Sequence, residues 1–217
     1  KLHEAKARMD IINQVAIFRE ALETHSESFG VRLSAGSIAL LSKYFQLLMK
    51  WNPRLHLVAP CSAEEFALRH VLESLLLIRY LPPGAAIADV GAGAGLPSVP
   101  CLIARSDIEA TLIESSQKKA VFLREALKAT ESWPRAKVVA ERFEDLEPPA
   151  VKFVTCRALD RFQELLPQLI RWSPHPSTLL LFGGESLQSK LDKEHLIYSS
   201  LLIPRSANRY LFVVSLA

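Results

Sequence analysis

Cysteine is scarce in this chain, and long apolar runs are missing. No stretch reaches the roughly eighteen uninterrupted apolar residues that indicate a membrane-spanning helix, so we expect no membrane span. The three cysteines show no metal-ligand spacing and cannot all pair with one another. They therefore predict no metal site and fit a reducing, cytoplasmic compartment. Internal repeats and low-complexity segments are missing too.

A strong charge of one sign is also absent. The net charge of +3 permits a nucleic-acid partner but does not demand one. Residues 1–27 mix charges at helical spacing and do not resemble a signal peptide, and the lack of a Met before Lys1 suggests that Lys1 is not the natural start. With 217 residues, 49% of them hydrophobic, the chain is long enough for one large domain or one domain with an appendage.

Helical spacing dominates the N-terminal part of the chain. Apolar residues recur at that spacing near 2–28, which predicts an amphipathic helix that ends before Gly30. Ser34 is placed to cap a second helix, and Pro53 is expected to stop it.

A third helix is predicted to follow a capping box that begins at Ser62 and to run to about Tyr80. The sequence Leu-Pro-Pro-Gly at 81–84 then breaks the pattern. We place a boundary there, between a helical N-terminal extension (1–81) and an α/β domain (82–217).

After this boundary, strand and helix patterns alternate. Strands are predicted at 85–90, 109–114, 136–140, 151–156, 177–182 and 210–216, and helices at 97–105, 116–130, 160–172 and 186–196, with a short turn at 142–146. Strands separated by helices predict a mostly parallel, Rossmann-like sheet that is covered on both faces.

The first strand of this α/β part leads into a glycine-rich turn. Residues 89–97 read Asp-Val-Gly-Ala-Gly-Ala-Gly-Leu-Pro, between the predicted strand and the predicted helix. Such a turn brings bare backbone close to a ligand, so Asp89, Gly91, Gly93 and Gly95 are predicted to form a nucleoside-binding loop. A turn whose glycines serve packing alone is the alternative.

An acidic residue stands at the end of the next predicted strand. Glu114 follows the glycines by roughly twenty residues, the spacing at which a Rossmann-like sheet brings a carboxylate to a ribose. The alternative is a solvated acid that precedes the helix cap at Ser115-Ser116. Together with the glycine turn, ribose binding is the favoured interpretation.

Both stretches resemble the small-subunit ribosomal RNA methyltransferase G family, also called the glucose-inhibited division protein B family. The glycine loop reads DVGAGAGLPSVP, and the stretch around the acid reads IESSQKKAVFLREAL. The similarity runs from about residue 35 to the C-terminus and includes Trp51-Asn52, His70 with Glu73-Ser74, Arg157-Ala158, Gly184 and Arg209. The family has Asp where this chain has Glu73.

This resemblance implies a class I, S-adenosylmethionine-dependent fold and methyl transfer to N7 of a guanosine in 16S ribosomal RNA. The partner would be that RNA or the small ribosomal subunit, and we expect a monomer. By position, the resemblance implies that the cofactor is lined by Gly91, Leu96, Glu114 (at the ribose), Phe143 and Glu144 (near the adenine) and Arg157.

Several positions depart from the family pattern. His56-Leu57-Val58 replaces the usual Asn-Leu-Thr, Gly183 replaces a lysine, and Ser215 stands where a lysine is frequent. These changes remove hydrogen-bonding and positive groups on the expected substrate side. A ribosomal RNA-binding or assembly factor without activity is therefore one alternative function. A dinucleotide-dependent oxidoreductase is another, although its glycines follow a different spacing.

The expected reaction needs little acid–base chemistry. N7 of guanine carries an exposed lone pair and no proton, so alignment and electrostatics can supply the catalysis. Arg157, at the end of the strand 151–156, is a candidate to contact the cofactor carboxylate or an RNA phosphate, or else to form a structural salt bridge with Asp160 or Glu144. His70 is a candidate to orient RNA or the loop.

The remaining candidates carry weaker signals. Cys156 lacks the Pro-Cys context of a pyrimidine methyltransferase nucleophile and is expected in the core. Trp51 is expected in the core rather than as a stacking platform. Two basic sets could contact RNA, or could be solvated surface: Lys118, Lys119, Arg124 and Lys128, and Arg54, His56, Arg69 and Arg79.

Overall fold

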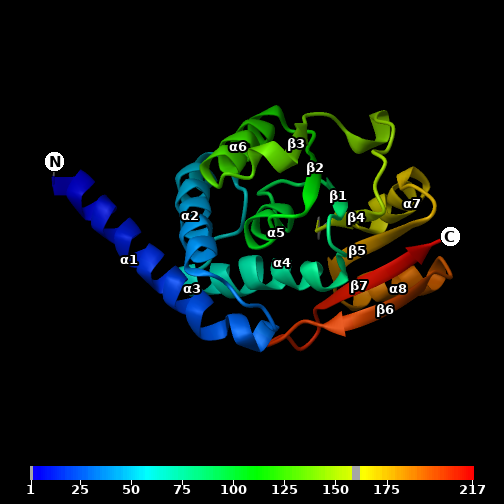
Figure 1. The fold of residues 1–217 in the computed structure, drawn as a ribbon, viewed down its shortest axis with the longest axis horizontal. Helices are drawn as coiled ribbons and strands as arrows, with labels where there is room; N and C mark the ends of the chain where they lie inside the picture. The colour runs from blue at the N-terminus through cyan, green and yellow to red at the C-terminus, as the bar shows by residue number, and fades with distance from the viewer. Residues whose placement is uncertain (1, 158–161) are drawn as a thin grey trace.

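Among the described residues, seven strands form one sheet in the order β3-β2-β1-β4-β5-β7-β6 (Figure 1). The computed structural model describes residues 2–157 and 162–217, and of residues 2–8 and 162–163 the backbone alone. The parallel strands are β1 (Ala86–Val90), β2 (Glu109–Ile113), β3 (Ala136–Val139), β4 (Phe153–Cys156) and β5 (Ser177–Gly183). The mostly parallel sheet that the sequence predicts is thus confirmed.

The two C-terminal strands, β6 (Ile197–Leu202) and β7 (Tyr210–Leu216), are antiparallel to their neighbours. The sequence predicts β7 but leaves the residues of β6 unassigned, and the expected helix 186–196 ends three residues too late. The observed helix α8 ends at Lys193. β6 is an edge strand with little buried apolar surface, and its first residue, Ile197, is 79% exposed. Apolar periodicity is therefore too weak there to mark a strand.

Helices cover both faces of the sheet. Adjacent strand residues point to opposite faces, so Leu180 belongs to one apolar cluster and Leu179 to the other. One cluster includes α5 (Ser98–Ala104) and α6 (Gln117–Ala129), and the other includes α7 (Phe162–Trp172) and α8 (Glu185–Lys193). Two covered faces explain why the central strands read as continuous apolar runs.

The N-terminal helices join the first of these clusters. They are α1 (Leu2–His25), a 3₁₀ turn η1 (Ser26–Phe29), α2 (Ala35–Leu55) and a helical run over 63–80. Phe18 of α1 stacks on Phe45 of α2 with ring centroids 4.6 Å apart, and both are buried. The first turns of α1 extend away from the rest of the molecule (Figure 1). Within the described residues, each helix is too short or too polar to cross a lipid bilayer.

The predicted helix starts are confirmed, and one predicted end is wrong. The hydroxyls of Ser34 and Ser62 accept hydrogen bonds from the third following amides, at 3.0 Å each. Pro53 does not stop α2, which continues to Leu55 and ends at a left-handed His56. A proline this close to a helix end costs only one hydrogen bond, so two more residues remain helical.

The helical run over 63–80 has an irregular centre. It comprises α3 (Ala63–Glu65), the π-helical segment η2 (Phe66–Leu72), α4 (Glu73–Leu75) and the 3₁₀ segment η3 (Leu76–Tyr80). The amide of Glu73 donates to the carbonyl of Leu68, five residues back. A π-helical segment frees carbonyl groups and is frequent at functional sites. The sequence predicts the extent of this run but not its π-helical part.

Candidate functional site

The strand order reverses between β1 and β4, and two cavities open at the carboxyl ends of these strands. Open α/β sheets bind ligands at such a switch point. The larger cavity, about 590 Å³, is lined by the loop 56–61, by the glycine turn and by His70 and Arg157. The smaller cavity, about 310 Å³, has Phe143 and Glu144 in its wall. Because both include Gly91, Glu114 and Lys119, we treat them as one cleft, the switch-point cleft.

The glycine turn packs tightly against α5. Gly91, Gly93 and Gly95 all have positive φ. A Cβ atom on Gly95 would lie 2.6 Å from Val99 Cγ2, so no larger residue fits there without movement. The amides of Gly91 and Ala92 both donate to the carbonyl of Ile113, at 2.9 and 3.1 Å. The turn is therefore fixed to the ends of β1 and β2.

Glu114 lies beside this turn and is buried. Its Oε2 accepts a hydrogen bond from the Gly93 amide at 2.9 Å, and its Oε1 accepts one from the Ser116 amide at 2.8 Å. The carboxylate lines both parts of the switch-point cleft and is held at both oxygens. Glu114 is therefore a buried acid rather than a solvated strand-end acid, and ribose binding stays a prediction.

Tyr44 of α2 supports the turn from the other side. Its hydroxyl donates to the carbonyl of Ala94 at 2.6 Å, and the side chain is fully buried. Burial raises the pKa of Tyr44, so its hydroxyl stays protonated. The sequence marks Tyr44 only as one apolar position of a helix, and no local signal links it to a turn fifty residues later.

Asp89 lies in β1, just before the turn, and lines neither cavity of the cleft. It is 0% exposed, and Ser98 faces it from α5, yet neither side chain makes a hydrogen bond of normal geometry within the described residues. Burial raises the pKa of Asp89 to about 7, and the nearby Glu114 adds to this effect, while Ser98 opposes it. A buried carboxyl of this kind is half protonated near neutral pH.

Phe143 and Glu144 reach the smaller cavity from the 3₁₀ turn η5 (Phe143–Asp145). The Phe143 ring is buried and meets Trp172 of α7 edge-on, with centroids 5.5 Å apart. Glu144 pairs with Arg142 at 3.1 Å between Oε1 and Nη2. The turn thus supplies an apolar wall and a carboxylate on the side of the cleft beyond Glu114.

Arg157 lines the larger cavity, but its guanidinium is held by the helical run 63–80. It donates to the carbonyls of Arg69 and His70, to Ser74 Oγ at 2.9 Å and to Glu73 Oε2 at 3.3 Å. The expected structural salt bridge therefore exists with a different acid. Glu144 pairs with Arg142 instead, and Asp160 lies outside the described residues.

Glu73 connects Arg157 to the loop before the last strand of the sheet. This carboxylate is only 3% exposed, and its other oxygen, Oε1, lies 2.6 Å from Nη2 of Arg209. Burial raises the pKa of Glu73, and the two arginines oppose that rise. Removal of Glu73 would leave Arg157, whose side chain is only 11% exposed, without a carboxylate partner among the described residues. His70, Glu73 and Ser74, which are among the positions that carry the family resemblance, thus all accept hydrogen bonds from the Arg157 guanidinium.

His70 lines the larger cavity, and its ring lies against Phe66 with centroids 5.1 Å apart. Burial lowers the pKa of His70 to about 3, and the nearby Arg157, Arg69 and Arg209 lower it further. The imidazole is therefore neutral at pH 7. It is suited to orient a ligand by hydrogen bonding and carries no proton to donate as an imidazolium.

The Trp51-Asn52 pair shapes the outer wall of the cleft. Asn52 donates from Nδ2 to the carbonyl of Val58 and accepts from the amide of Val58, at 3.1 and 3.0 Å. Trp51 packs edge-on against Phe122 of α6 and donates to Glu125 at 3.2 Å. Asn52 thus fixes the loop 56–61, and Trp51 joins α2 to α6 rather than forming a stacking platform.

The two basic sets are dispersed. Of the first, Lys119 lines the cleft, while Lys128 lies over the Trp133 ring at 5.5 Å. Of the second, His56 and Arg69 line the larger cavity, and Arg79 donates to the carbonyl of Phe29. Cys156 is buried at the end of β4, as expected, and borders the smaller cavity.

Known proteins share both the sequence and the architecture. The family model for rRNA small subunit methyltransferase G matches residues 37–204. The ribosomal RNA small subunit methyltransferase G of Halorhodospira halophila is 37% identical over 174 residues, which cover 80% of this chain and 82% of that protein. The protein of the same name from Xanthomonas axonopodis pv. citri is 43% identical over 129 residues, 59% of this chain and 60% of that protein.

Solved structures show the same fold at low identity. A SAM-dependent methyltransferase from Aquifex aeolicus superposes with a TM-score of 0.56 at 13% identity, over 70% of this chain and 93% of that one. TYW2 from M. jannaschii in complex with AdoMet gives 0.53 at 14% identity, over 68% and 74%. The fold is therefore the Rossmann-like fold of class I methyltransferases, as the sequence predicts. Because the family model matches most of this chain, the chain belongs to the rRNA small subunit methyltransferase G family.

Proposed function

We propose that this chain transfers a methyl group from S-adenosylmethionine to N7 of a guanosine in 16S ribosomal RNA. The observation that carries the proposal is the buried Glu114 carboxylate beside the glycine turn, at the switch point of the sheet. The names of the relatives support ribosomal RNA as the substrate. We further propose that the protein acts as a monomer in the cytoplasm, on the RNA or on the small subunit.

The residues of the switch-point cleft suit the cofactor. Gly91, Leu96 and Glu114 would hold its sugar and adjoining atoms, and Phe143 with Glu144 would hold the adenine. Asp89, Gly93 and Gly95 would shape the turn, and Arg157 would close the far wall. When bound, S-adenosylmethionine supplies an electrophilic methyl group on a positively charged sulfur.

The chain's own residues have a modest chemical task in this reaction. Guanine N7 attacks through a lone pair and loses no proton, so no general base is needed. This is consistent with the site, because burial lowers the pKa of His70 to about 3, which makes it a weak base, and the Arg157 guanidinium is already protonated. Catalysis would come from the alignment of the base with the methyl group and from the electrostatics of the cleft.

Calorimetric titration with S-adenosylmethionine is the first test. Glu114→Gln should weaken binding by about tenfold, because it removes a charge-assisted acceptor and turns an amide group toward the Gly93 amide. Glu109→Gln, at the opposite and exposed end of the same strand, is the matched control and should change nothing. No binding to the unmodified protein at millimolar ligand would overturn the proposal.

Methyl transfer to small subunits from a strain that lacks this modification is the second test. The expected product is N7-methylguanosine in 16S ribosomal RNA, identified by mass spectrometry of the digested RNA. Cofactor binding without transfer would favour an assembly factor. Thermal protection by NAD, and none by S-adenosylmethionine, would favour an oxidoreductase.

A further inference from the structure

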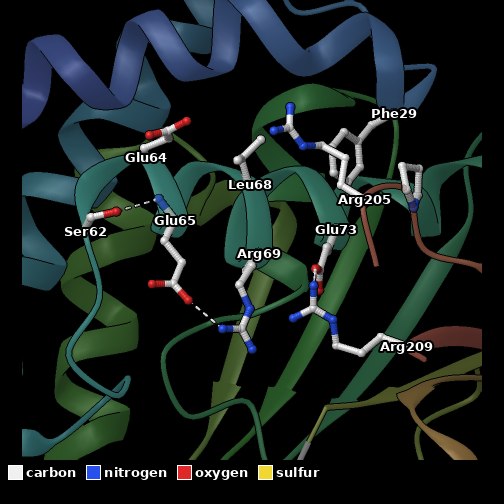
Figure 2. A pocket seen from close by; sticks show the side chains of 10 residues that line it. Phe29, Ser62, Glu64, Glu65, Leu68, Arg69, Glu73, Arg205 and Arg209 are labelled. Atoms are coloured by element: carbon white, nitrogen blue, oxygen red, sulfur yellow. Dashed lines mark hydrogen bonds and ion pairs between the residues drawn. The ribbon is translucent and has the colours of Figure 1, made fainter. Parts of the chain in front are cut away.

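We propose that a third cavity, beside the switch-point cleft, binds a backbone phosphate of the RNA. This inference rests on the proposed function and deepens it. The cavity, which we call the arginine cavity, has a volume of about 250 Å³ (Figure 2). It lies between the helical run 63–80, the end of η1 and the loop between β6 and β7.

The arginine cavity adjoins the larger cavity of the cleft, because Glu65 and Arg69 line both. Arg69 stands on η2, the same π-helical segment whose His70 faces the cleft. A polynucleotide with one base in the switch-point cleft therefore passes Arg69 on its way across the arginine cavity. The geometry thus assigns this cavity to a neighbouring part of the same strand rather than to the methylated base.

Three arginines border the cavity, from two separate segments. Figure 2 shows Arg69 on the helical run and Arg205 and Arg209 on the loop before β7, with Arg209 reaching to Glu73. The lining includes the apolar residues Phe29 and Leu68. Guanidinium groups suit a phosphodiester, because they donate paired hydrogen bonds to its oxygens.

Three carboxylates also border the cavity, and their charges must be counted. Glu73 is buried and already shared between Arg157 and Arg209. Glu65 pairs with Arg69 on the helix surface, where the two side chains are 39% and 52% exposed. A surface pair of this kind contributes little, so a phosphate can take over Arg69 at small cost. Glu64 makes no ion pair with a described residue.

Arg205 is the cation best placed to meet an anion. Its Nη1 lies 2.9 Å from Nδ1 of His25, and within the described residues no carboxylate pairs with it. The loop that carries it is tied to itself, since the Arg209 amide donates to Ser206 Oγ at 2.8 Å and the Ile203 amide donates to the Arg209 carbonyl at 2.9 Å. Arg205 and Arg209 are thus presented on a preorganised loop.

The test compares Arg205→Gln with Arg171→Gln in the full chain, because Arg205 lines the arginine cavity and not the switch-point cleft. Arg171 is exposed at the end of α7 and borders none of the cavities described above. Binding to 16S ribosomal RNA is measured from 50 to 300 mM KCl. Arg205→Gln should bind about tenfold more weakly at low salt. Its plot of log affinity against log salt should be shallower by about 0.7–0.9 for each RNA phosphate that the protein no longer neutralises.

The outcomes separate this inference from the proposed function. S-adenosylmethionine affinity should be unchanged in Arg205→Gln, because Arg205 lies outside the lining of the switch-point cleft. RNA binding and salt dependence equal to those of Arg171→Gln would overturn the phosphate site while the methyltransferase proposal stands. A parallel loss of cofactor affinity would overturn it too, because it would assign Arg205 to the cofactor rather than to the RNA. Failure of the unmodified protein to bind cofactor or transfer methyl would instead refute the proposed function.

Discussion

The glycine turn and the Arg157 cluster are two walls of one cleft, and they are held in different ways. The turn is fixed largely by residues close in sequence, such as Glu114, whose carboxylate binds the Gly93 amide across a separation of 21 residues. Arg157 is held by Arg69, His70, Glu73 and Ser74, which precede it by 83 to 88 residues.

This difference teaches where sequence reasoning works. The turn can be recognised from its glycines, because only glycine freely adopts the positive φ values that the turn requires. Arg157 is also recognisable in the sequence as a charged residue at the end of a strand. Its partners, however, depend on which helix packs over the end of β4. A charged residue at a strand end therefore signals a site, while the groups that it binds follow from the tertiary fold.

Glu73→Ala should break the Arg157 cluster with the largest effect. It leaves the largely buried Arg157, 11% exposed, without its carboxylate and frees Arg209, at a cost of about 3–5 kcal/mol in the free energy of unfolding. Urea denaturation measures this loss. Glu65→Ala, which removes the exposed partner of Arg69, is the control and should cost less than about 1 kcal/mol. Equal losses in the two variants would show that the cluster is not a buried network.

Gly95→Ala tests the turn in the same way. The residue has a φ of +83°, and a new Cβ would lie 2.6 Å from Val99 Cγ2, so strain and overpacking together should cost about 3 kcal/mol. Gly84→Ala is the matched control. It has a φ of +70° but no atom within 4 Å of the new Cβ, and should cost only about 1 kcal/mol. A Gly95→Ala protein as stable as Gly84→Ala would contradict the close approach of the turn to α5.

Asp89→Asn sharpens the comparison through pH. Burial raises the folded-state pKa of Asp89 to about 7, above the ordinary 3.8. The folded protein thus binds more protons than the unfolded chain between these values, and the wild type loses stability as pH rises through that window. The stability advantage of Asn over Asp should grow by about 2 kcal/mol from about pH 5.5 to pH 8.5. Urea melts of both proteins at the two pH values measure it, and a constant difference would show that Asp89 is ionised throughout.

Tyr44→Phe should have the smallest effect on stability. It removes the bond from the Tyr44 hydroxyl to the Ala94 carbonyl and should cost about 1–2 kcal/mol, with a several-fold loss of S-adenosylmethionine affinity as the turn loosens. Tyr198→Phe removes an exposed hydrogen bond to Asp192 and serves as the control. If cofactor affinity is equal in the two variants, the turn needs no support from α2.

Prediction from sequence succeeds where a residue type has one dominant structural use. The caps at Ser34 and Ser62 are predictable because a hydroxyl before a helix satisfies a free amide. All six predicted strands are present. The unpredicted β6 reads Ile-Tyr-Ser-Ser-Leu-Leu and lacks the regular alternation of apolar and polar residues that marks a strand. Pro53 misleads because proline disrupts a helix interior far more than its last turn.

The amino-acid sequence alone determined three features of this protein, because each depends on local chemistry. They are the order of the elements other than β6, the glycine turn after β1, and the acidic residue after β2. Only the tertiary structure decided three other features, because each depends on the packing of distant segments. These are the pairing of Arg157 with Glu73, the hydrogen bond from Tyr44 to the turn, and the three arginines that border the cavity beside the cleft. The reason is physical: backbone preferences act over a few residues, whereas the partner of a buried polar group is whatever the folded core brings within hydrogen-bond distance.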